Sequence, residues 1–312
     1  MRLAVRKLIV VCGIFLILAG ALGAGCAAKP AEPGHIVFEA RDENGADIYR
    51  MKDDGSEIML LVDGPTWDGT PALSPDGKRL AFASDRDGDP EIFVMNLDGS
   101  DLIQLTDNDA TDLMPRWSPD GTRIAFVSDR TYKVPLAGGS LEIVAGMELY
   151  TMNADGSDLQ RLSGNENDVS LYPSWSPDGT RIVYMNLTDH GTLRVVDLNN
   201  VEAEPAELSL EIDLSAWSPQ WSPNGAHIAF MGDDGASKDV YRVDPNGKNL
   251  VNLTADWPHL SGDPAWSPDG SKIVFASGGD GTINLYVVDR AGKKITALTE
   301  VQGQYVQPHW SK

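Results

Sequence analysis

A short phrase recurs along the chain, and this repetition restricts the fold more than any other feature of the sequence. WSPDGTRIAFVSDR begins at Trp117, and close variants begin at Trp175, Trp221 and Trp266. A chain written in repeats folds as similar units, each of which buries its apolar face against its neighbours. We therefore expect an array or ring of equivalent units over most of the chain.

Each repeat contains an apolar triplet, followed by a second strand pattern and by a shorter third one that ends in Leu-Thr or a close variant. The triplets lie at residues 36–38, 80–82, 124–126, 182–184, 228–230 and 273–275, with a period of about 44–47 residues apart from one longer unit. The triplets do not alternate with polar residues, which favours strands that are covered on both faces. Four short strands per unit at this period are typical of a β-propeller blade.

The turn residues support short antiparallel hairpins. Ser-Pro-Asp-Gly places Pro where φ is close to −65° and Gly where φ is positive, which predicts a tight reversal between the first and second strands. Asp-Gly recurs between the third and fourth strands, for example at Asp98-Gly99. Each first strand contains a proline, and a strand tolerates proline at a sheet edge, such as the edge that faces a propeller's channel.

The two ends of the repeat region complement each other. The chain enters the repeats at Ile36, already on a second strand, and stops at Trp310-Ser311-Lys312, which is a first strand without its turn. Joining these ends leaves no open sheet edge. The sequence therefore predicts an all-β fold, a six-bladed β-propeller over residues 35–312 with four-stranded blades, closed by the C-terminal strand joining the N-terminal blade.

The WSPDGxxIAF and IYxMNxDGSxxxxLT phrases resemble the repeats of the TolB-type propellers, which are often described as WD-like. The resemblance covers His35 to Lys312, with weaker copies where Asn199-Asn200 replaces Asp-Gly and where Leu73 replaces Trp. It implies a propeller fold. TolB itself carries an α/β domain before its propeller, and the resemblance implies that this domain is lacking here, because only a short segment precedes the first strand.

The N-terminal segment resembles a bacterial lipoprotein signal. Residues 1–25 contain three basic residues, an apolar run and then small residues before Cys26, the position at which such proteins are lipidated. Residues 26–34 would form a tether, and an uncleaved membrane anchor is the alternative. Both interpretations predict an extracytoplasmic location. Lipidation predicts attachment to the membrane through the lipid anchor only, on the periplasmic side of the outer membrane if the organism has one.

Charge and cysteine content exclude several kinds of function. The net charge of −21 disfavours nucleic acid and anionic lipid headgroups as partners, although many exported proteins are acidic for solubility alone. The two cysteines, Cys12 and Cys26, both precede the repeats. Thiol catalysis, disulfides and a cysteine-ligated zinc are therefore excluded in the repeat region.

The direction of the chain places the loops on two faces of the expected ring. The Ser-Pro-Asp-Gly and Asp-Gly turns share one face, and the more varied loops share the other, where binding is expected. We predict a binding surface at the channel mouth on that second face, although its tryptophans could instead pack between blades. The predicted binding residues are Trp67, Asp68, Asp112, Tyr172, Trp217, Trp257, His259 and Tyr305.

Two further features have a functional and a purely structural interpretation. The insertion at residues 130–146 is either a lid or partner contact, or a tolerated loop expansion. Asp85, Asp87, Asp89 and Glu91 alternate as in a calcium loop, but Pro90 stands where an EF-hand needs glycine, which favours a solvated turn. No metal ligands and no cofactor are predicted, and calcium held in an acidic channel is the alternative.

The sequence contains none of the motifs that mark common active sites. There is no G-x-S-x-G elbow, no H-E-x-x-H and no P-loop lysine motif, and the five histidines have no ligand spacing. We therefore expect a monomeric, non-catalytic scaffold that binds an envelope protein or a peptidoglycan-associated partner. The alternative is a propeller enzyme, a lyase, lactonase or glycosidase, with a divalent ion at the channel mouth.

Overall fold

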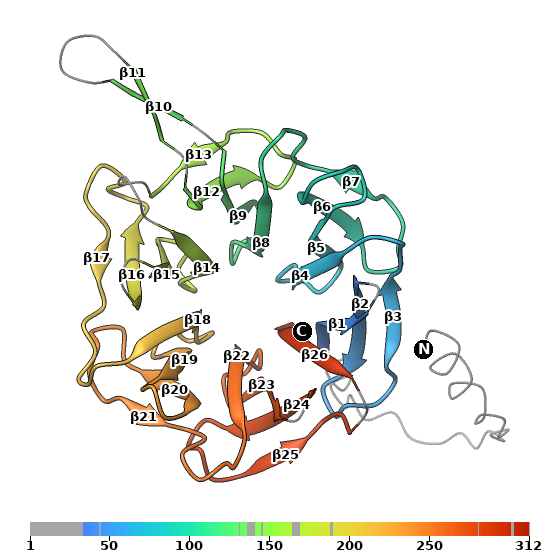
Figure 1. The fold of residues 1–312 in the computed structure, drawn as a ribbon, viewed down its shortest axis with the longest axis vertical. Coiled ribbons are helices and arrows are strands. Elements are labelled where there is room, and N and C mark those ends of the chain that lie inside the picture. Colours follow the sequence, from blue (N-terminus) through green and yellow to red (C-terminus); the bar gives the residue numbers. More distant parts are fainter. Residues whose placement is uncertain are drawn as a thin grey trace, which may run out of the picture. The chain divides into compact units, whose positions relative to one another are not determined.

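Antiparallel β-sheets arranged around a central channel make up the regular structure in the computed structural model of this chain (Figure 1). The structure describes residues 34–311 except 44, 131, 136–140, 145, 164–168, 188–189, 280 and 301–302. All of these belong to one unit, Pro33–Lys312. Cys26 and the predicted signal and tether up to residue 33 lie outside the described residues. No described segment forms a helix long and apolar enough to cross a membrane.

Four sheets of the ring have four strands each, and the chain runs through each of them from the centre outwards (Figure 1). They consist of β4 (Asp68–Leu73), β5 (Arg79–Ser84), β6 (Glu91–Asn96) and β7 (Ile103–Gln104); β8 (Asp112–Trp117), β9 (Arg123–Ser128), β12 (Glu148–Asn153) and β13 (Gln160–Arg161); β14 (Ser170–Trp175), β15 (Arg181–Leu187), β16 (Gly191–Asp197) and β17 (Ala206–Glu207); and β18 (Ser215–Trp221), β19 (Ile228–Asp233), β20 (Lys238–Val243) and β21 (Val251–Asn252).

The remaining ring strands form a single eight-stranded sheet. Its members are β22 (Leu260–Trp266), β23 (Lys272–Gly279), β24 (Thr282–Asp289), β25 (Ile295–Ala297), β26 (Gln304–Ser311), β1 (His35–Asp42), β2 (Gly45–Lys52) and β3 (Met59–Val62). The prediction of six separate four-stranded blades is therefore wrong, because the described residues form only four such sheets. The cause is local: Ile283 of β24 pairs in parallel with Gln304 of β26 and joins two strand groups into one sheet.

The ring closes through β26 and β1, which come from opposite ends of the described chain. The strands are antiparallel, with His35 opposite Ser311, Ile36 opposite Trp310 and Ala40 opposite Tyr305. The C-terminal strand thus occupies the innermost position beside β1, as the matching chain ends predicted. Both long edges of β1 are paired, because β2 lies on its other side.

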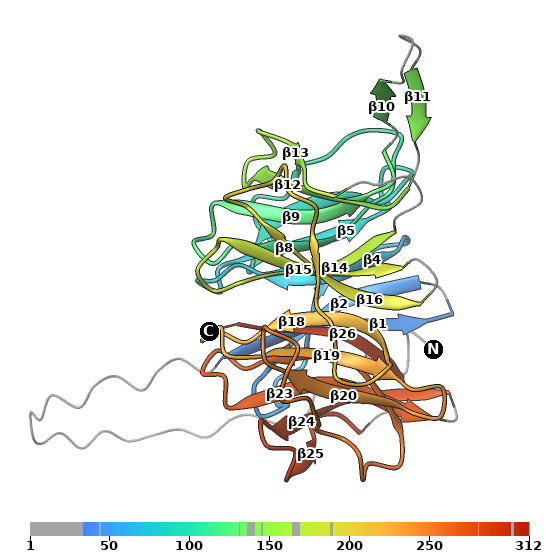
Figure 2. The same cartoon turned by 90° about the vertical axis from the view of Figure 1, so that its left-hand side faces the viewer.

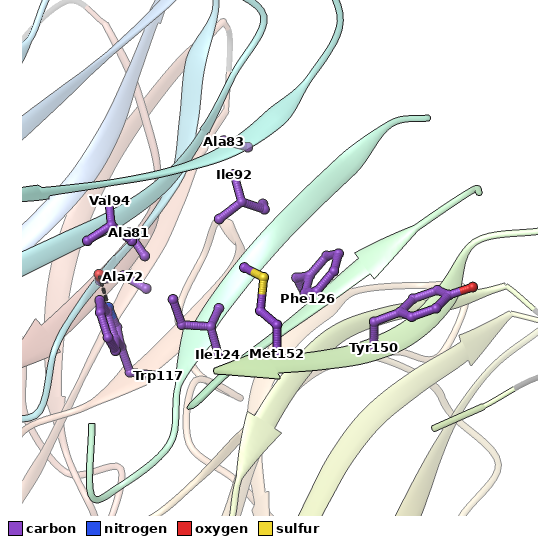
Figure 3. Close-up of a cluster of buried hydrophobic side chains, with 10 residues drawn as sticks. All are labelled: Ala72, Ala81, Ala83, Ile92, Val94, Trp117, Ile124, Phe126, Tyr150 and Met152. Atoms are coloured by element: carbon purple, nitrogen blue, oxygen red, sulfur yellow. Dashed lines mark hydrogen bonds between the residues drawn. The ribbon is translucent and has the colours of Figure 1, made fainter. Parts of the chain in front are cut away.

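The apolar triplets form the buried core of the sheets. All of them lie in strands paired on both sides, and their side chains are at most 1% exposed. Between adjacent sheets, Ala72 and Ile92 of one sheet pack in the same cluster as Trp117, Phe126 and Met152 of the next (Figure 3). The core therefore lies between the sheets, which explains why the triplets do not alternate with polar residues. Burying each large side chain contributes about 1.5–3 kcal/mol.

The Ser-Pro-Asp-Gly turns have the predicted geometry. In the turn before β9, Gly121 has φ of 70°, and its backbone N–H donates to the Ser118 carbonyl at 2.9 Å. The Ser118 hydroxyl donates to Asp120 Oδ1 at 2.6 Å and accepts from the Arg123 N–H at 2.9 Å. These bonds lower the pKa of Asp120, with the Ser118 hydroxyl as the largest cause. The repeated turn residues are thus explained by the turn itself.

The insertion at residues 130–146 forms a hairpin of its own. Strands β10 (Tyr132–Pro135) and β11 (Leu141–Val144) pair with each other and with no other strand in the described chain. The hairpin extends away from the sheets of the ring in both views (Figures 1 and 2). It connects β9 to β12, so it starts from the face that carries the more varied loops. Its role as a lid, a partner contact or a simple expansion stays a prediction.

Candidate functional site

The two kinds of loop occupy opposite ends of the strands, as predicted. At one end, the Leu97 N–H donates to the Lys78 carbonyl at 2.8 Å, which brings a strand three-to-four turn beside a Ser-Pro-Asp-Gly turn. At the other end, the Asp85 N–H donates to the Trp67 carbonyl at 3.2 Å. We call the first end the short-turn face and the second the variable-loop face. The predicted binding residues lie either in loops of the variable-loop face or in the innermost strands that line the channel.

Asp68 and Asp112, predicted at the channel mouth, are fully buried rather than exposed around it. Each begins an innermost strand and forms an ion pair, Asp68 with Arg86 at 2.8 Å and Asp112 with Arg130 at 2.7 Å. Each arginine also lies over two rings of its own sheet; for Arg86 these are Phe82 and Phe93. One oxygen of each carboxylate has no hydrogen-bond partner among the described residues. The two pairs fasten innermost strands to the loops that follow the second strands.

Three other predicted residues lie partly buried against the sheets. Tyr305 of β26 meets the Phe38 ring edge-on, with centroids 5.2 Å apart, and burial raises the pKa of its hydroxyl. Trp67 packs against the apolar cluster between two sheets, and its backbone N–H donates to Asp85 Oδ1 at 2.8 Å. Trp217 lies in β18 opposite Met231 and is partly exposed. For Trp67 the packing matches the structural alternative.

Trp257 and His259 lie together in the loop before β22. The Trp257 indole N–H donates to Ser277 Oγ at 2.9 Å, and its ring meets Tyr286 edge-on at 5.0 Å. His259 is exposed and meets the Trp257 ring edge-on at 5.8 Å. Pro258 is also exposed, and Leu260 is 55% exposed. We call residues 257–260 the aromatic patch. The sequence analysis predicted two of its members, Trp257 and His259, and missed Leu260. Nothing in the sequence around Leu260 indicates that its side chain is exposed.

A belt of residues surrounds the channel, and the sequence analysis selected only one of them, Tyr172. Each belt residue directly precedes the proline of an innermost strand and has a left-handed φ between 48° and 57°: Thr70, Met114, Tyr172, Ser218, Asp263 and Gln307. Where these residues lie, the register of the strand pair shifts, as between Gly69 and Ala72. Left-handed φ is uncommon for residues other than glycine and is favoured only where the surroundings impose it.

Hydrogen bonds connect neighbouring members of the belt. The Met114 N–H donates to Thr70 Oγ1 at 3.2 Å, and the Tyr172 N–H donates to the Met114 sulfur at 3.3 Å. Asp263 accepts from the Ser218 hydroxyl at 3.0 Å and from the Gln307 N–H at 3.3 Å. Side chains of one innermost strand thus accept hydrogen bonds from backbone N–H groups of the next innermost strand. These bonds form where the register of the strand pairs shifts.

Tyr172 is the one predicted binding residue that belongs to the belt. Burial raises the pKa of its hydroxyl to about 12, with a further contribution from the Asp263 charge. Tyr172 is therefore a neutral donor in the channel at neutral pH. The sequence does contain a feature that points to the belt. The residue before each first-strand proline differs from one repeat to the next, whereas the proline itself recurs in every repeat.

The channel opens into a cavity of about 420 Å³ at the short-turn face. Its walls repeat around the ring: the tryptophan at the end of an innermost strand, or Leu73 in its place, and, in every unit except that of Trp310, the proline two residues later. Arg116, Gln220 and His309 also line it. None of the residues predicted from the sequence lines this cavity, because the prediction placed the binding surface on the other face.

Buried acidic groups also begin several third strands. Glu91 of β6 is 1% exposed and accepts the Asn108 backbone N–H at 2.6 Å. Burial raises the pKa of Glu91 to about 7, and Asp112 adds to the effect. Asp85 of the same acidic segment accepts the Trp67 N–H, so it helps to shape a loop. Within the described residues, no three acidic or histidine side chains lie together as metal ligands.

Comparison with known proteins identifies the repeats. Residues 35–146 and 140–312 match the family described as the TolB beta propeller domain. The Tol-Pal system protein TolB of Alcanivorax borkumensis is 30% identical over 83 residues, which span 27% of this chain. The matching region is 19% of that protein's length, so the chain spans only about a fifth of this relative.

Solved structures share the architecture at low identity. TolB from Acinetobacter baumannii matches with a TM-score of 0.73 and 20% identity, over 89% of this chain and 66% of that one. An oligogalacturonate lyase from Vibrio parahaemolyticus matches with a TM-score of 0.52 and 17% identity, over 78% of this chain and 72% of that one. At such identities the likeness concerns the fold, and the fold serves both a Tol system protein and a lyase.

Proposed function

The chain belongs to the TolB β-propeller family, and from this membership we propose that it is a non-catalytic scaffold that binds another protein of the cell envelope. One relative is a Tol-Pal system protein by name, which supports an envelope protein or a peptidoglycan-associated partner. The repeat units would hold the loops of the variable-loop face at fixed positions. Binding residues on loops that a rigid frame positions are common in proteins.

The aromatic patch is the observation that carries this proposal. Leu260 is the most exposed of the large aliphatic residues that the structure describes at this face, and His259 and Pro258 are exposed beside it. Trp257 is held in place by Ser277 and Tyr286, so a partner would meet a pre-ordered ring. Aromatic and apolar side chains that are fixed before binding supply much of the energy of protein interfaces.

The experiment is affinity purification from solubilised membranes with the full-length chain as bait. The variant Leu260→Glu with His259→Ala keeps Trp257, which packs in the core, and removes the exposed part of the patch. We expect it to lose the partner that the parent recovers. Leu102→Glu is the matched control, because Leu102 is 45% exposed next to the Asp98-Gly99 turn of the short-turn face. Equal recovery of every partner by all three proteins would contradict the assignment.

Export and lipidation at Cys26 are part of the proposal, and the sequence pattern supports them. A lipidated scaffold would stay with membranes through its acyl chains alone. We expect metabolic labelling with a fatty acid to mark the parent protein, and Cys26→Ser to abolish both the label and the membrane association. A labelled Cys26→Ser protein would contradict this assignment and leave the binding proposal intact.

The proposal also states that the chain does not catalyse a reaction. The rival is a lyase, lactonase or glycosidase that uses a divalent ion at the channel mouth, and the lyase with the same architecture makes this class worth testing. Metal analysis of the purified protein and a screen of glycans and lactones provide the measurement. A stoichiometric metal together with turnover would replace the scaffold by the enzyme.

A further inference from the structure

The cavity at the short-turn face carries an unusual charge for this protein. The chain has 46 acidic and 25 basic residues, yet no aspartate or glutamate among the described residues lines the cavity. Among the described residues, Arg116 is the one lysine or arginine in its wall, and this residue is only 8% exposed. A cationic pocket in so acidic a protein needs an explanation, because burying a charge costs free energy unless a partner offsets it.

Arg116 forms no ion pair or hydrogen bond with a carboxylate among the described residues. Its Nη1 donates to the carbonyl of the neighbouring Pro115 at 2.8 Å, and its Nε has no hydrogen-bond partner. Asp263 is the acidic group that acts on it most strongly, but that carboxylate accepts from Ser218 and Gln307 in the belt. Burial lowers the pKa of Arg116 to about 10, so the guanidinium is charged at neutral pH.

The other unsatisfied groups on the cavity-lining residues are donors as well. Trp117, Trp175 and Trp266 each donate their indole N–H to a backbone carbonyl of the preceding sheet. Trp221 and Trp310 occupy the same place in the repeat, but their indole N–H groups are buried without a partner in the described residues. All the unsatisfied buried side-chain atoms of the cavity wall are therefore donors.

His309 adds a further donor. Its Nδ1 accepts the Leu73 N–H at 3.2 Å, and burial lowers the pKa of the ring to about 3, with Arg116 adding to the effect. A neutral imidazole that accepts at Nδ1 carries its hydrogen on Nε2. The cavity wall thus combines one positive charge with neutral donors, which is the arrangement that an anion requires.

We propose that this cavity binds the carboxylate group of a small ligand, with Arg116 as the charged contact. The planar guanidinium fork matches a carboxylate in geometry and in charge. A phosphate dianion would bring a second negative charge for which the described residues of the wall offer no cation. The prolines and tryptophans would contact the apolar part of the ligand. This site lies at the short-turn face, so it is independent of the partner surface proposed above.

Calorimetric titration of the purified full-length protein tests the proposal with matched pairs of ligands. One pair is N-acetyl-dialanine with a free and with an amidated C-terminus, and the other is galacturonate with galactose. Chloride and inorganic phosphate are the further anions. The two pairs distinguish a peptide end from a sugar acid as the source of the carboxylate. We expect at least one carboxylate to bind at least about tenfold more tightly than its neutral counterpart, than chloride and than phosphate.

Arg116→Gln should abolish this preference, while Lys78→Gln should preserve it. Lys78 is an exposed residue in a turn of the same face, so the control makes the same change in net charge. Because the substitution removes an unpaired buried charge, Arg116→Gln should melt no lower than the parent. Equal affinity for charged and neutral ligands, an equal response to chloride or phosphate, or unchanged binding by Arg116→Gln would overturn the proposal.

Discussion

Trp310 lies opposite Ile36 in the antiparallel strands β26 and β1, so residues from the two ends of the described chain share one sheet. Trp310 is 7% exposed and packs in the same apolar cluster as Ile36 and Phe38. The strand that closes the ring is therefore part of the core. The channel, its belt and both loop faces depend on this closure.

Asp68→Ala should destabilise the protein by about 2–4 kcal/mol, because it leaves Arg86 without the buried carboxylate that it contacts at 2.8 Å. The free energy of unfolding in urea provides the measurement. Asp109→Ala removes an exposed carboxylate from the same face and should change the stability by less than about 0.5 kcal/mol. Similar losses in the two variants would show that the buried ion pair has no special role.

Glu91 predicts a specific pH dependence of stability. Its pKa is about 7 in the folded protein against 4.5 for an ordinary glutamate, so the folded state holds a proton that the unfolded state releases between these values. The contribution of Glu91 to stability should therefore fall as the pH rises from about 4.5 to 7.

Glu91→Gln should flatten this part of the pH profile and raise the melting temperature at pH 8 relative to the parent. The melting temperature of a protein of this size rises by about 2–4 °C for each kcal/mol gained in the free energy of unfolding. Melting curves between pH 4 and pH 8 provide the measurement. Asp98→Asn is the control, because the bonds from Ser100 lower the pKa of that exposed carboxyl and place its titration below this window. Parallel profiles for the parent and Glu91→Gln would show that Glu91 is ionised throughout.

Thr254 explains why units of the repeat end in Leu-Thr or a close variant. Its buried hydroxyl accepts the Val240 N–H at 3.0 Å and donates to Asp239 Oδ1 at 2.8 Å, which ties the end of β21 to the start of β20. Thr254→Val keeps the shape and removes the hydroxyl from the Val240 N–H and from Asp239 Oδ1, at a cost of about 2 kcal/mol. Thr254→Ser keeps the hydroxyl and should lose less. Chemical denaturation compares them, and equal losses would assign the effect to packing.

Sequence reasoning succeeded where one residue type determines a local geometry. Gly121 allows the positive φ of its turn, and Ser118 and Asp120 form the hydrogen bonds that the turn needs. The apolar character of the triplets does not alternate, which predicts that they are buried, as the structure confirms. The pairing of Trp310 with Ile36 followed from the phase of the repeat at the two chain ends, so it required no knowledge of distant contacts.

The same reasoning failed where an irregularity in the backbone determines which side chain faces the channel. The prediction of mouth positions such as Asp68 depends on counting residues back from the proline of an innermost strand, which assumes regular strand pairing. The left-handed φ of Thr70 and the register shift beside it interrupt that count, and Asp68 is buried with Arg86 instead. A residue before proline usually prefers the extended region, so its left-handed conformation could not be expected from the pattern.

The number of separate sheets could not be inferred either, for a similar reason. A single parallel pairing, Ile283 with Gln304, joins two groups of strands that the repeats present as separate units. Nothing in the repeated phrase marks these two residues. The cavity beside Arg116 could not be predicted either, because it is lined mainly by tryptophans and prolines that recur in the repeats. The sequence analysis expected binding where the loops vary.

Deletion of residues 304–312 tests ring closure most directly, because it removes β26 and leaves one edge of β1 unpaired. Thermal unfolding of the truncated chain is compared with that of the parent and of a control that lacks only Lys312. We expect the control to melt with the parent, and the truncated chain to lose its cooperative transition or melt at least about 10 °C lower. A truncated chain that melts cooperatively at the parent's temperature would contradict the closed ring.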